Sequence, residues 1–236
     1  MKEILKYSDF GVELSTPYVL QLMDCYPGNP LYEEMEEEYE EIKEMLTSLG
    51  KPQALVFFGE MPKELAMEDA PAGAPVAYVL FTEGAEISKY STGMFAEGDY
   101  VKGMIADAVA SSYLFELDNL VMEKLKVECA RRKVGILKRL EAPADLPMEA
   151  QKIIFDKCEA KRELGMDITC GYMFDPVKTS GLIFVLSEDP SVFQAQHDCS
   201  TCKAVNCKMR KKSFPAPKKP EMISMKTTLI IRRAKK

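Results

Sequence analysis

A short run near the C-terminus gathers residues that bind soft metals. Cys199, Cys202 and Cys207 follow the only histidine of the chain, His197, in the spacing Cys-x2-Cys-x4-Cys. Thiolates at such short spacing can converge on zinc or on an iron–sulfur cluster, since both centres prefer sulfur ligands. The alternative is three free thiols, or a redox pair with a third cysteine beside it. We expect zinc or a 4Fe–4S cluster at this loop.

The fourth ligand of this site lies outside the run, because either centre usually takes four protein ligands. The candidates are Cys170, Cys25 and His197. His197 is only two residues from Cys199, a spacing that makes binding to one centre awkward. We therefore rank Cys170 above His197 as the residue that completes the set.

The composition indicates a folded chain without membrane segments. The sequence has 236 residues, of which 47% are hydrophobic, enough to bury a sizeable core in one large domain or two small ones. Its N-terminus lacks the apolar run of a signal peptide, and no apolar run is long enough to span a bilayer. Four of the seven cysteines are scattered, which argues against a disulfide framework. We expect a soluble, cytoplasmic protein with no membrane partner.

The net charge of −6 conceals a strong asymmetry along the chain. Residues 203–236 hold twelve lysines and arginines and one acid, Glu221, whereas residues 1–202 hold 19 basic and 36 acidic residues. A basic tail can bind nucleic acid. This tail has one aromatic residue, Phe214, and no DNA-binding or RNA-binding motif. We expect it to lie against the acidic body or to hold an anionic partner or cluster, and we do not expect nucleic acid.

Hydrophobic periodicity and turn residues give the elements that must position these cysteines. Helical spacing predicts helices over 31–49 and 99–132. A short helix is expected over 85–96, before Gly98, and a further helix over 147–164, between Pro147 at its first position and Gly165 at its end. Short apolar runs predict strands over 54–58, 76–81, 166–170, 181–186 and 223–231. We expect a loop over 62–75 and a turn-rich connector over 139–147, and we expect Asp145 to cap or begin the helix over 147–164.

These elements predict an α+β fold, with a mixed or antiparallel sheet and long central helices. Residues 1–75 would pack on a main domain of residues 76–198, followed by the cysteine loop and basic tail over 199–236, all within one compact domain. The chain has no Gly-x-Ser-x-Gly motif, P-loop or Gly-x-Gly-x-x-Gly motif, so nothing in it predicts a self-sufficient hydrolase.

The order of motifs resembles the activation (reactivation) domain of cobalamin-dependent methionine synthase. The resemblance covers roughly residues 76–210, and more weakly the N-terminal part. It is closer still to stand-alone relatives of that domain in anaerobic bacteria, which end in Cys-x2-Cys-x4-Cys-x2-Arg. The matching residues are Ala106-Asp107-Ala108, Arg139, Asp145-Leu146-Pro147, Leu164-Gly165-Met166, Asp175-Pro176, Ser180-Gly181, and the ending Cys199, Cys202, Cys207 and Arg210.

The resemblance implies S-adenosylmethionine in a shallow groove and a corrinoid bound by a partner protein. Arg139 matches the arginine that meets the ligand carboxylate, and Asp145 matches the end of the same turn. The sequence departs from the family pattern at 141–144, where Glu-Ala-Pro-Ala replaces a Pro-Gly-Tyr segment. Cys170 stands where the methionine synthase domain has a glutamate, which supports Cys170 as a ligand.

The function predicted from these features is that of an accessory protein in the reductive reactivation of a corrinoid (vitamin B12) methyltransferase. A cluster at Cys199, Cys202 and Cys207 would supply low-potential electrons. The alternative is a non-catalytic docking module, in which zinc stabilises the C-terminal loop and the protein binds a partner. The sequence leaves open whether the chain catalyses a reaction by itself.

Overall fold

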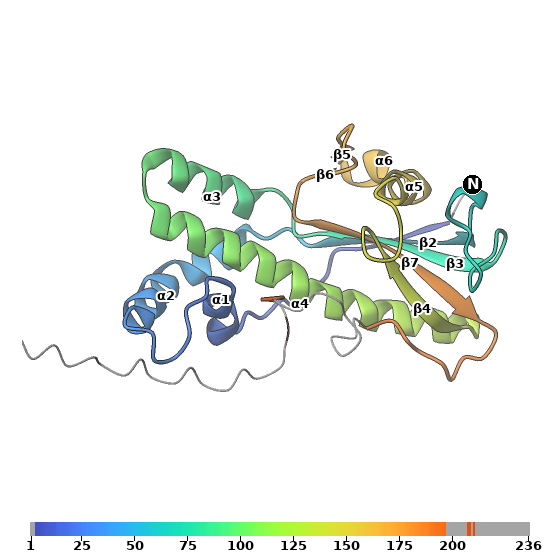
Figure 1. Ribbon diagram of the computed structural model, residues 1–236, viewed down its shortest axis with the longest axis horizontal. Coiled ribbons are helices and arrows are strands. Elements are labelled where there is room, and N and C mark those ends of the chain that lie inside the picture. The colour runs from blue at the N-terminus through green and yellow to red at the C-terminus, as the bar shows by residue number, and fades with distance from the viewer. Residues whose placement is uncertain (1–2, 197–206, 209, 211–236) are drawn as a thin grey trace, which may run out of the picture.

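The computed structural model describes residues 3–196, 207, 208 and 210 (Figure 1). Its centre is a five-stranded antiparallel sheet in the order β1-β2-β3-β7-β4. The strands are β1 (Ile4–Tyr7), β2 (Gln53–Glu60), β3 (Pro75–Thr82), β7 (Thr179–Ser187) and β4 (Gly135–Glu141). A separate hairpin pairs β5 (Asp167–Ile168) with β6 (Phe174–Asp175). The central strands β3 and β7 are buried on both faces, which explains their continuous apolar runs.

Helices cover the two faces of this sheet (Figure 1). The C-terminal half of α4 (Tyr100–Arg132) packs on one face, where it meets Val79 of β3 and Phe184 of β7. Helices α5 (Ala150–Lys157) and α6 (Ala160–Leu164) pack on the other face, against Tyr78 and Ile183. Successive residues of a strand point to opposite faces, so each central strand contributes to both cores.

A third core lies beyond the end of the sheet. There α1 (Thr16–Leu22), α2 (Tyr32–Leu49) and α3 (Glu86–Glu97) pack around the N-terminal half of α4 (Figure 1). Small buried residues on α4, including Ala106 and Ala110, let neighbouring helices approach closely. Asp99 caps α4 by accepting a hydrogen bond from the Lys102 N–H. Because α4 has 33 residues, it connects this helical region to the sheet.

The structure confirms the predicted fold class, an antiparallel sheet with long helices. Helices predicted over 31–49, 85–96 and 99–132 correspond to α2, α3 and α4, and the strands over 54–58, 76–81 and 181–186 correspond to β2, β3 and β7. The loop over 62–75 holds one short 3-10 helix, Lys63–Leu65.

Other expectations were wrong. The helix predicted over 147–164 is two helices, because Glu159 adopts a left-handed conformation with φ of 52°. The strand over 166–170 shrinks to Asp167–Ile168. The connector over 139–147 begins inside β4, and β1 and α1 were not predicted at all. The strand predicted over 223–231 lies outside the described residues.

In the part of the chain that the structure describes, no helix combines the length and the apolar character needed to cross a bilayer.

Candidate ligand groove and cysteine segment

Arg139 lies on β4 and reaches toward α4. It pairs in register with Phe184 of β7, whose side chain packs on the α4 side of the sheet. Its Nη1 atom is 2.8 Å from Oδ2 and 3.1 Å from Oδ1 of Asp118 on α4. Its Nη2 atom is 3.3 Å from Oε2 of Glu141. The side chains of Arg139 and Asp118 are only 10% and 13% exposed, so this ion pair is largely shielded from water.

Two acids therefore hold the guanidinium that the sequence assigned to a ligand carboxylate. Nη1 also lies 3.4 Å from the backbone oxygen of Ala195, so Arg139 connects α4, β4 and the segment that follows β7. A ligand carboxylate at this position would meet Asp118 and Glu141, and like charges at short range repel. In this arrangement Arg139 holds β4, α4 and the segment after β7 together.

The segment after β7 is held against β4 by backbone hydrogen bonds. The Ile136 N–H donates to the Val192 oxygen at 2.8 Å, and the Gln194 N–H donates to the Ile136 oxygen at 2.9 Å. Gly135 permits this close approach, because a Cβ atom there would lie 2.1 Å from the Asp189 oxygen and 2.5 Å from the Val192 oxygen. The consequence is that Phe193 and Gln194 lie next to α4.

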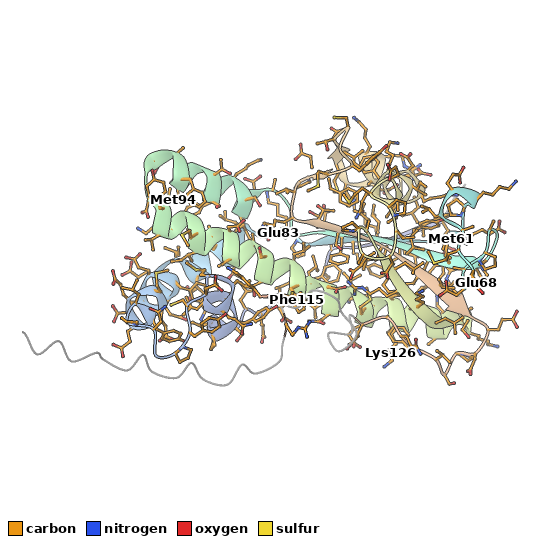
Figure 2. All side chains as sticks on the ribbon, viewed as in Figure 1. Met61, Glu68, Glu83, Met94, Phe115 and Lys126 are labelled. Carbon is orange, nitrogen blue, oxygen red and sulfur yellow. The ribbon has the colours of Figure 1, made fainter. Side chains whose placement is uncertain are left out.

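A groove of about 610 Å³ opens between this segment and α4. It is lined by Glu123 and Lys126 of α4 and by Phe193, Gln194 and Gln196. The Lys126 ammonium lies 5.7 Å from the centre of the Phe193 ring, and Figure 2 labels Lys126 on this part of α4. An aromatic face, two amides, one acid and one base suit a polar ligand that carries a flat ring.

None of the five groove residues was predicted from the sequence. The nearest signal in the sequence is Phe193 followed by glutamines at alternate positions, and this pattern is too common to indicate a site. What makes the groove is the pairing of residues 192–194 with β4, which depends on contacts between distant parts of the chain.

Asp145 closes the turn that follows β4. Its carboxylate accepts a hydrogen bond from the Glu141 N–H at 3.2 Å, and its own N–H donates to the Glu141 oxygen at 2.8 Å. The expectation that Asp145 caps or begins the next helix was wrong, because α5 begins at Ala150 with Glu149 at the N-cap position. Arg139 and Asp145 thus lie near each other, connected through Glu141.

The cysteine run is only partly described. His197, Cys199 and Cys202 lie outside the described residues, whereas Cys207 is described and half-buried. The next residue is fixed on α1, since the Lys208 oxygen accepts a hydrogen bond from Gln21 Nε2 at 2.8 Å. The Lys208 ammonium also pairs with Asp24 Oδ2 at 2.5 Å. Cys207 and Lys208 therefore lie near the end of α1, where Cys25 follows Asp24.

The two remaining candidates for the fourth ligand lie in different environments. Cys25 is buried in the core around α1, and burial raises the pKa of its thiol. Cys170 is exposed in the turn between β5 and β6, on the α5 and α6 side of the molecule and away from α1 (Figure 1). Among the described residues, no three His, Cys, Asp or Glu side chains are arranged to hold a metal ion.

A buried carboxyl, Glu83, lies where β3 leaves the sheet for the helical region (Figure 2). Glu83 is 1% exposed, and neither carboxyl oxygen has a hydrogen-bond partner among the described residues. Burial raises the pKa of Glu83 to about 8; Asp107 also raises it, and Lys178 lowers it. The Lys178 ammonium is 2.8 Å from both Asp107 Oδ1 and Ser111 Oγ. Burial, followed by the charge of Glu83, raises the pKa of Tyr113 to about 12.

Comparison with known proteins identifies the fold. No family model matches the chain, and no curated protein matches it. A solved structure, the crystal structure of the MetH reactivation domain bound to AdoHcy, is similar to it with a TM-score of 0.56. The similarity covers 78% of this chain and 78% of that chain, at 12% sequence identity. The resemblance drawn from the sequence is thus confirmed at the level of the fold.

Proposed function

We propose that this chain is an accessory protein in the reductive reactivation of a corrinoid protein or a cobalamin-dependent methyltransferase. The observation that carries the proposal is the shared fold, which extends over 78% of both chains when compared with a MetH reactivation domain. The cysteine run supports it, because a redox centre beside a corrinoid could supply the electron that reduces cob(II)alamin.

The groove between α4 and residues 193–196 is the proposed site for an S-adenosyl compound. The MetH reactivation domain with the similar fold was solved bound to AdoHcy. Here Phe193 can stack against an adenine ring, Gln194 can hydrogen-bond its edge, and Glu123 can accept from ribose hydroxyls. Lys126 is the cation among the described residues that line the groove, so we assign the ligand carboxylate to Lys126. S-adenosylmethionine, when bound, would supply the methyl group.

Arg139 fits a different role in this proposal. Its guanidinium is bound by Asp118 and Glu141 and lies beside the Ala195 oxygen, so it supports one wall of the groove from beneath. Asp145 supports the same wall indirectly, by holding the turn at Glu141. Both residues then affect binding through the positions of other groups.

The metal site is proposed at Cys199, Cys202 and Cys207, with Cys25 as the fourth ligand. The contacts of Lys208 with Gln21 and Asp24 favour Cys25, because they bring the segment around Cys207 to the end of α1. Cys170, the residue that the sequence ranked above His197, is the alternative, and it requires the cysteine run to reach the β5–β6 turn. A 4Fe–4S cluster would transfer electrons, whereas zinc would stabilise the segment.

A visible spectrum with metal analysis tests the metal site on protein purified without oxygen. We expect broad absorbance near 400 nm with iron and sulfide, a typical range for iron–sulfur clusters. The Cys202→Ser variant should lose this absorbance, and the Cys129→Ser variant should retain it, since Cys129 is buried against the sheet. A colourless protein with about one zinc per chain would contradict the redox role and favour the docking module.

A second experiment tests the reaction. Free cob(II)alamin is mixed with the protein, S-adenosylmethionine and limiting dithionite, and the spectrum is followed. One electron reduces cob(II)alamin to cob(I)alamin, and the methyl group passes to cobalt to give methylcobalamin and S-adenosylhomocysteine. We expect the protein to accelerate this conversion and the Lys126→Gln variant to be slower. If methylcobalamin forms at the same rate with and without the protein, the proposed role in reductive reactivation is contradicted for free cobalamin as the acceptor.

A further inference from the structure

A second groove, on another part of the molecule, is lined mainly by apolar side chains. It has a volume of about 470 Å³ and lies between the end of α1, the end of α3 and the N-terminal half of α4. Its lining is Leu22, Met23, Phe95, Met104 and Ala108, with Asp24, Asp107, Ser111 and Lys208 at polar positions. The proposed function uses none of these apolar residues.

The apolar surface continues from this groove to the end of the α3–α4 hairpin. Phe95 is 40% exposed, Met104 is 47% exposed and Tyr100 is 64% exposed. Figure 2 labels Met94 at this end of α3, which projects away from the sheet. Single exposed apolar residues are ordinary, but a group of large ones next to a groove marks an interaction surface.

The course of the chain indicates what covers this surface. Lys208 lines the groove, and its contacts with Gln21 and Asp24 fix the chain there. Residues 211–236 continue from this point, and their apolar side chains are concentrated in residues 222–231, with the sequence Met-Ile-Ser-Met-Lys-Thr-Thr-Leu-Ile-Ile. The chain that leads to this apolar stretch therefore starts from a residue that lines an apolar groove.

The connecting segment is long enough for the stretch to reach the groove. Residues 209–221 lie between Lys208 and the apolar stretch. A chain of that length spans up to about 45 Å, at about 3.5 Å per residue. The groove residues Met104 and Ser111 are seven positions apart on α4, about 10 Å at about 1.5 Å per residue. The tether allows the stretch to fold back along the groove.

Charge favours the same arrangement. Residues 211–236 hold nine lysines and arginines and one acid, Glu221. The wall formed by α1 packs against α2, which carries eight glutamates. Basic residues on both sides of the apolar stretch would then lie close to an acidic helix, an interaction that adds to burial of the apolar side chains.

We propose that the groove between α1, α3 and α4 binds residues 222–231 of the same chain. The apolar side chains of the stretch cover Met104 and Phe95, and the basic residues beside it face the acidic surface of α2. Both ends of the segment that follows Cys207 are then attached to the body.

The absence of tryptophan from the chain allows a direct test in the full-length protein. The Leu229→Trp variant places a single tryptophan in the apolar stretch, and its emission reports whether the ring is buried. We expect emission shifted to the blue in dilute protein. Adding Met104→Arg should shift the emission to the red, whereas adding Val127→Arg should not. Val127 is 71% exposed on α4 outside the groove, so it is a matched control.

Emission that is unchanged by Met104→Arg, or already shifted to the red without it, would overturn the proposal. A blue shift that appears only as protein concentration rises would show that the stretch binds a second copy, and this also overturns it. A photo-crosslinking residue at position 104 of the full-length chain gives an independent measurement. We expect crosslinks to residues 222–231 within monomers, and crosslinks only between chains would again overturn the proposal.

Discussion

The Nη1 atom of Arg139 lies 2.8 Å from Oδ2 of Asp118, and this pair joins strand β4 to helix α4 in a site that is largely closed to water. Breaking a buried ion pair by removing one partner leaves the other charge without compensation. Nη1 of the same arginine lies 3.4 Å from the backbone oxygen of Ala195, so the pair also supports the wall of the candidate ligand groove.

The first prediction concerns this pair. Arg139→Gln should lower the free energy of unfolding by about 3–5 kcal/mol, because the Asp118 carboxyl then loses its counter-charge in a shielded site. The double variant Arg139→Gln with Asp118→Asn should recover part of this loss. Urea unfolding at neutral pH gives the measurement. If Arg139→Gln costs less than about 1 kcal/mol, as an exposed pair would, the pair is not shielded as described.

The second prediction concerns Glu83 and pH. The pKa of Glu83 is about 8 in the folded chain, against an ordinary value of 4.5, because burial favours the protonated form. The folded state therefore binds this proton more tightly than the unfolded state. The contribution of Glu83 to stability is complete below about pH 4.5 and is lost as pH rises toward and through about 8.

Glu83→Gln removes this titration. Each pKa unit is worth about 1.4 kcal/mol of stability. The free energy of unfolding of the variant should therefore be a few kcal/mol higher than that of the parent protein above about pH 9, and similar to it near pH 5. Unfolding curves at both pH values measure the change. Asp156→Asn on α5, whose carboxylate is exposed, is the matched control. A gain from Glu83→Gln that does not depend on pH would contradict the assignment.

The third prediction concerns Gly135, which lets residues 189–192 approach β4. A Cβ atom there would lie 2.1 Å from a backbone oxygen, so the chain must shift. Gly135→Ala should lower the free energy of unfolding by about 1–3 kcal/mol, the usual cost of overpacking, and should weaken the AdoHcy binding that we propose for the groove. Calorimetric titration with AdoHcy follows the second effect.

Gly93 provides the control for this substitution. It lies within α3, and a Cβ atom added there meets no other atom within 4 Å. Gly93→Ala should raise stability by about 0.5–1 kcal/mol, because alanine loses less conformational freedom than glycine in a helix. Equal effects at Gly135 and Gly93 would mean that the close approach at β4 is absent in solution.

Local patterns in the sequence predicted much of this fold. The spacing of apolar residues located α2 and α4, whose buried residues include Tyr39 and Leu46 on α2 and Leu117, Val121 and Leu125 on α4. Apolar runs located β3 and β7, because these strands are covered on both faces. The motif order around Arg139 and Asp145 pointed to the fold that the MetH reactivation domain shares.

The features that the sequence did not predict depend on contacts between distant parts of the chain. β4 carries Lys138 and Arg139 at positions that face Asp69 and Asp118, and these charges hid the strand within an apparent connector. The groove depends on the pairing of residues 192–194 with β4, and no local sequence pattern predicts such a pairing. Cys25 was one of three candidates in the sequence, and what favours it over Cys170 is the contacts that Lys208 makes with Gln21 and Asp24.

The fourth prediction separates Cys25 from Cys170 as the remaining ligand. The contacts of Lys208 with Gln21 and Asp24 place Cys207 and Lys208 near the end of α1, where Cys25 follows Asp24, whereas Cys170 lies in the β5–β6 turn away from α1 (Figure 1). Cys25→Ser should therefore lower the metal content of protein purified without oxygen by at least half, because a centre that loses one of four ligands binds its metal less tightly. Cys170→Ser should leave the metal content unchanged.

Loss of packing must be distinguished from loss of a ligand in this comparison. Cys158 is buried in the core on the α5 side, so Cys158→Ser introduces the same hydroxyl into a core without touching the metal set. Metal retained in Cys158→Ser and lost in Cys25→Ser identifies Cys25 as a ligand. Metal lost in Cys170→Ser and retained in Cys25→Ser would identify Cys170, and the cysteine run would then have to leave α1 to reach the β5–β6 turn when it binds metal.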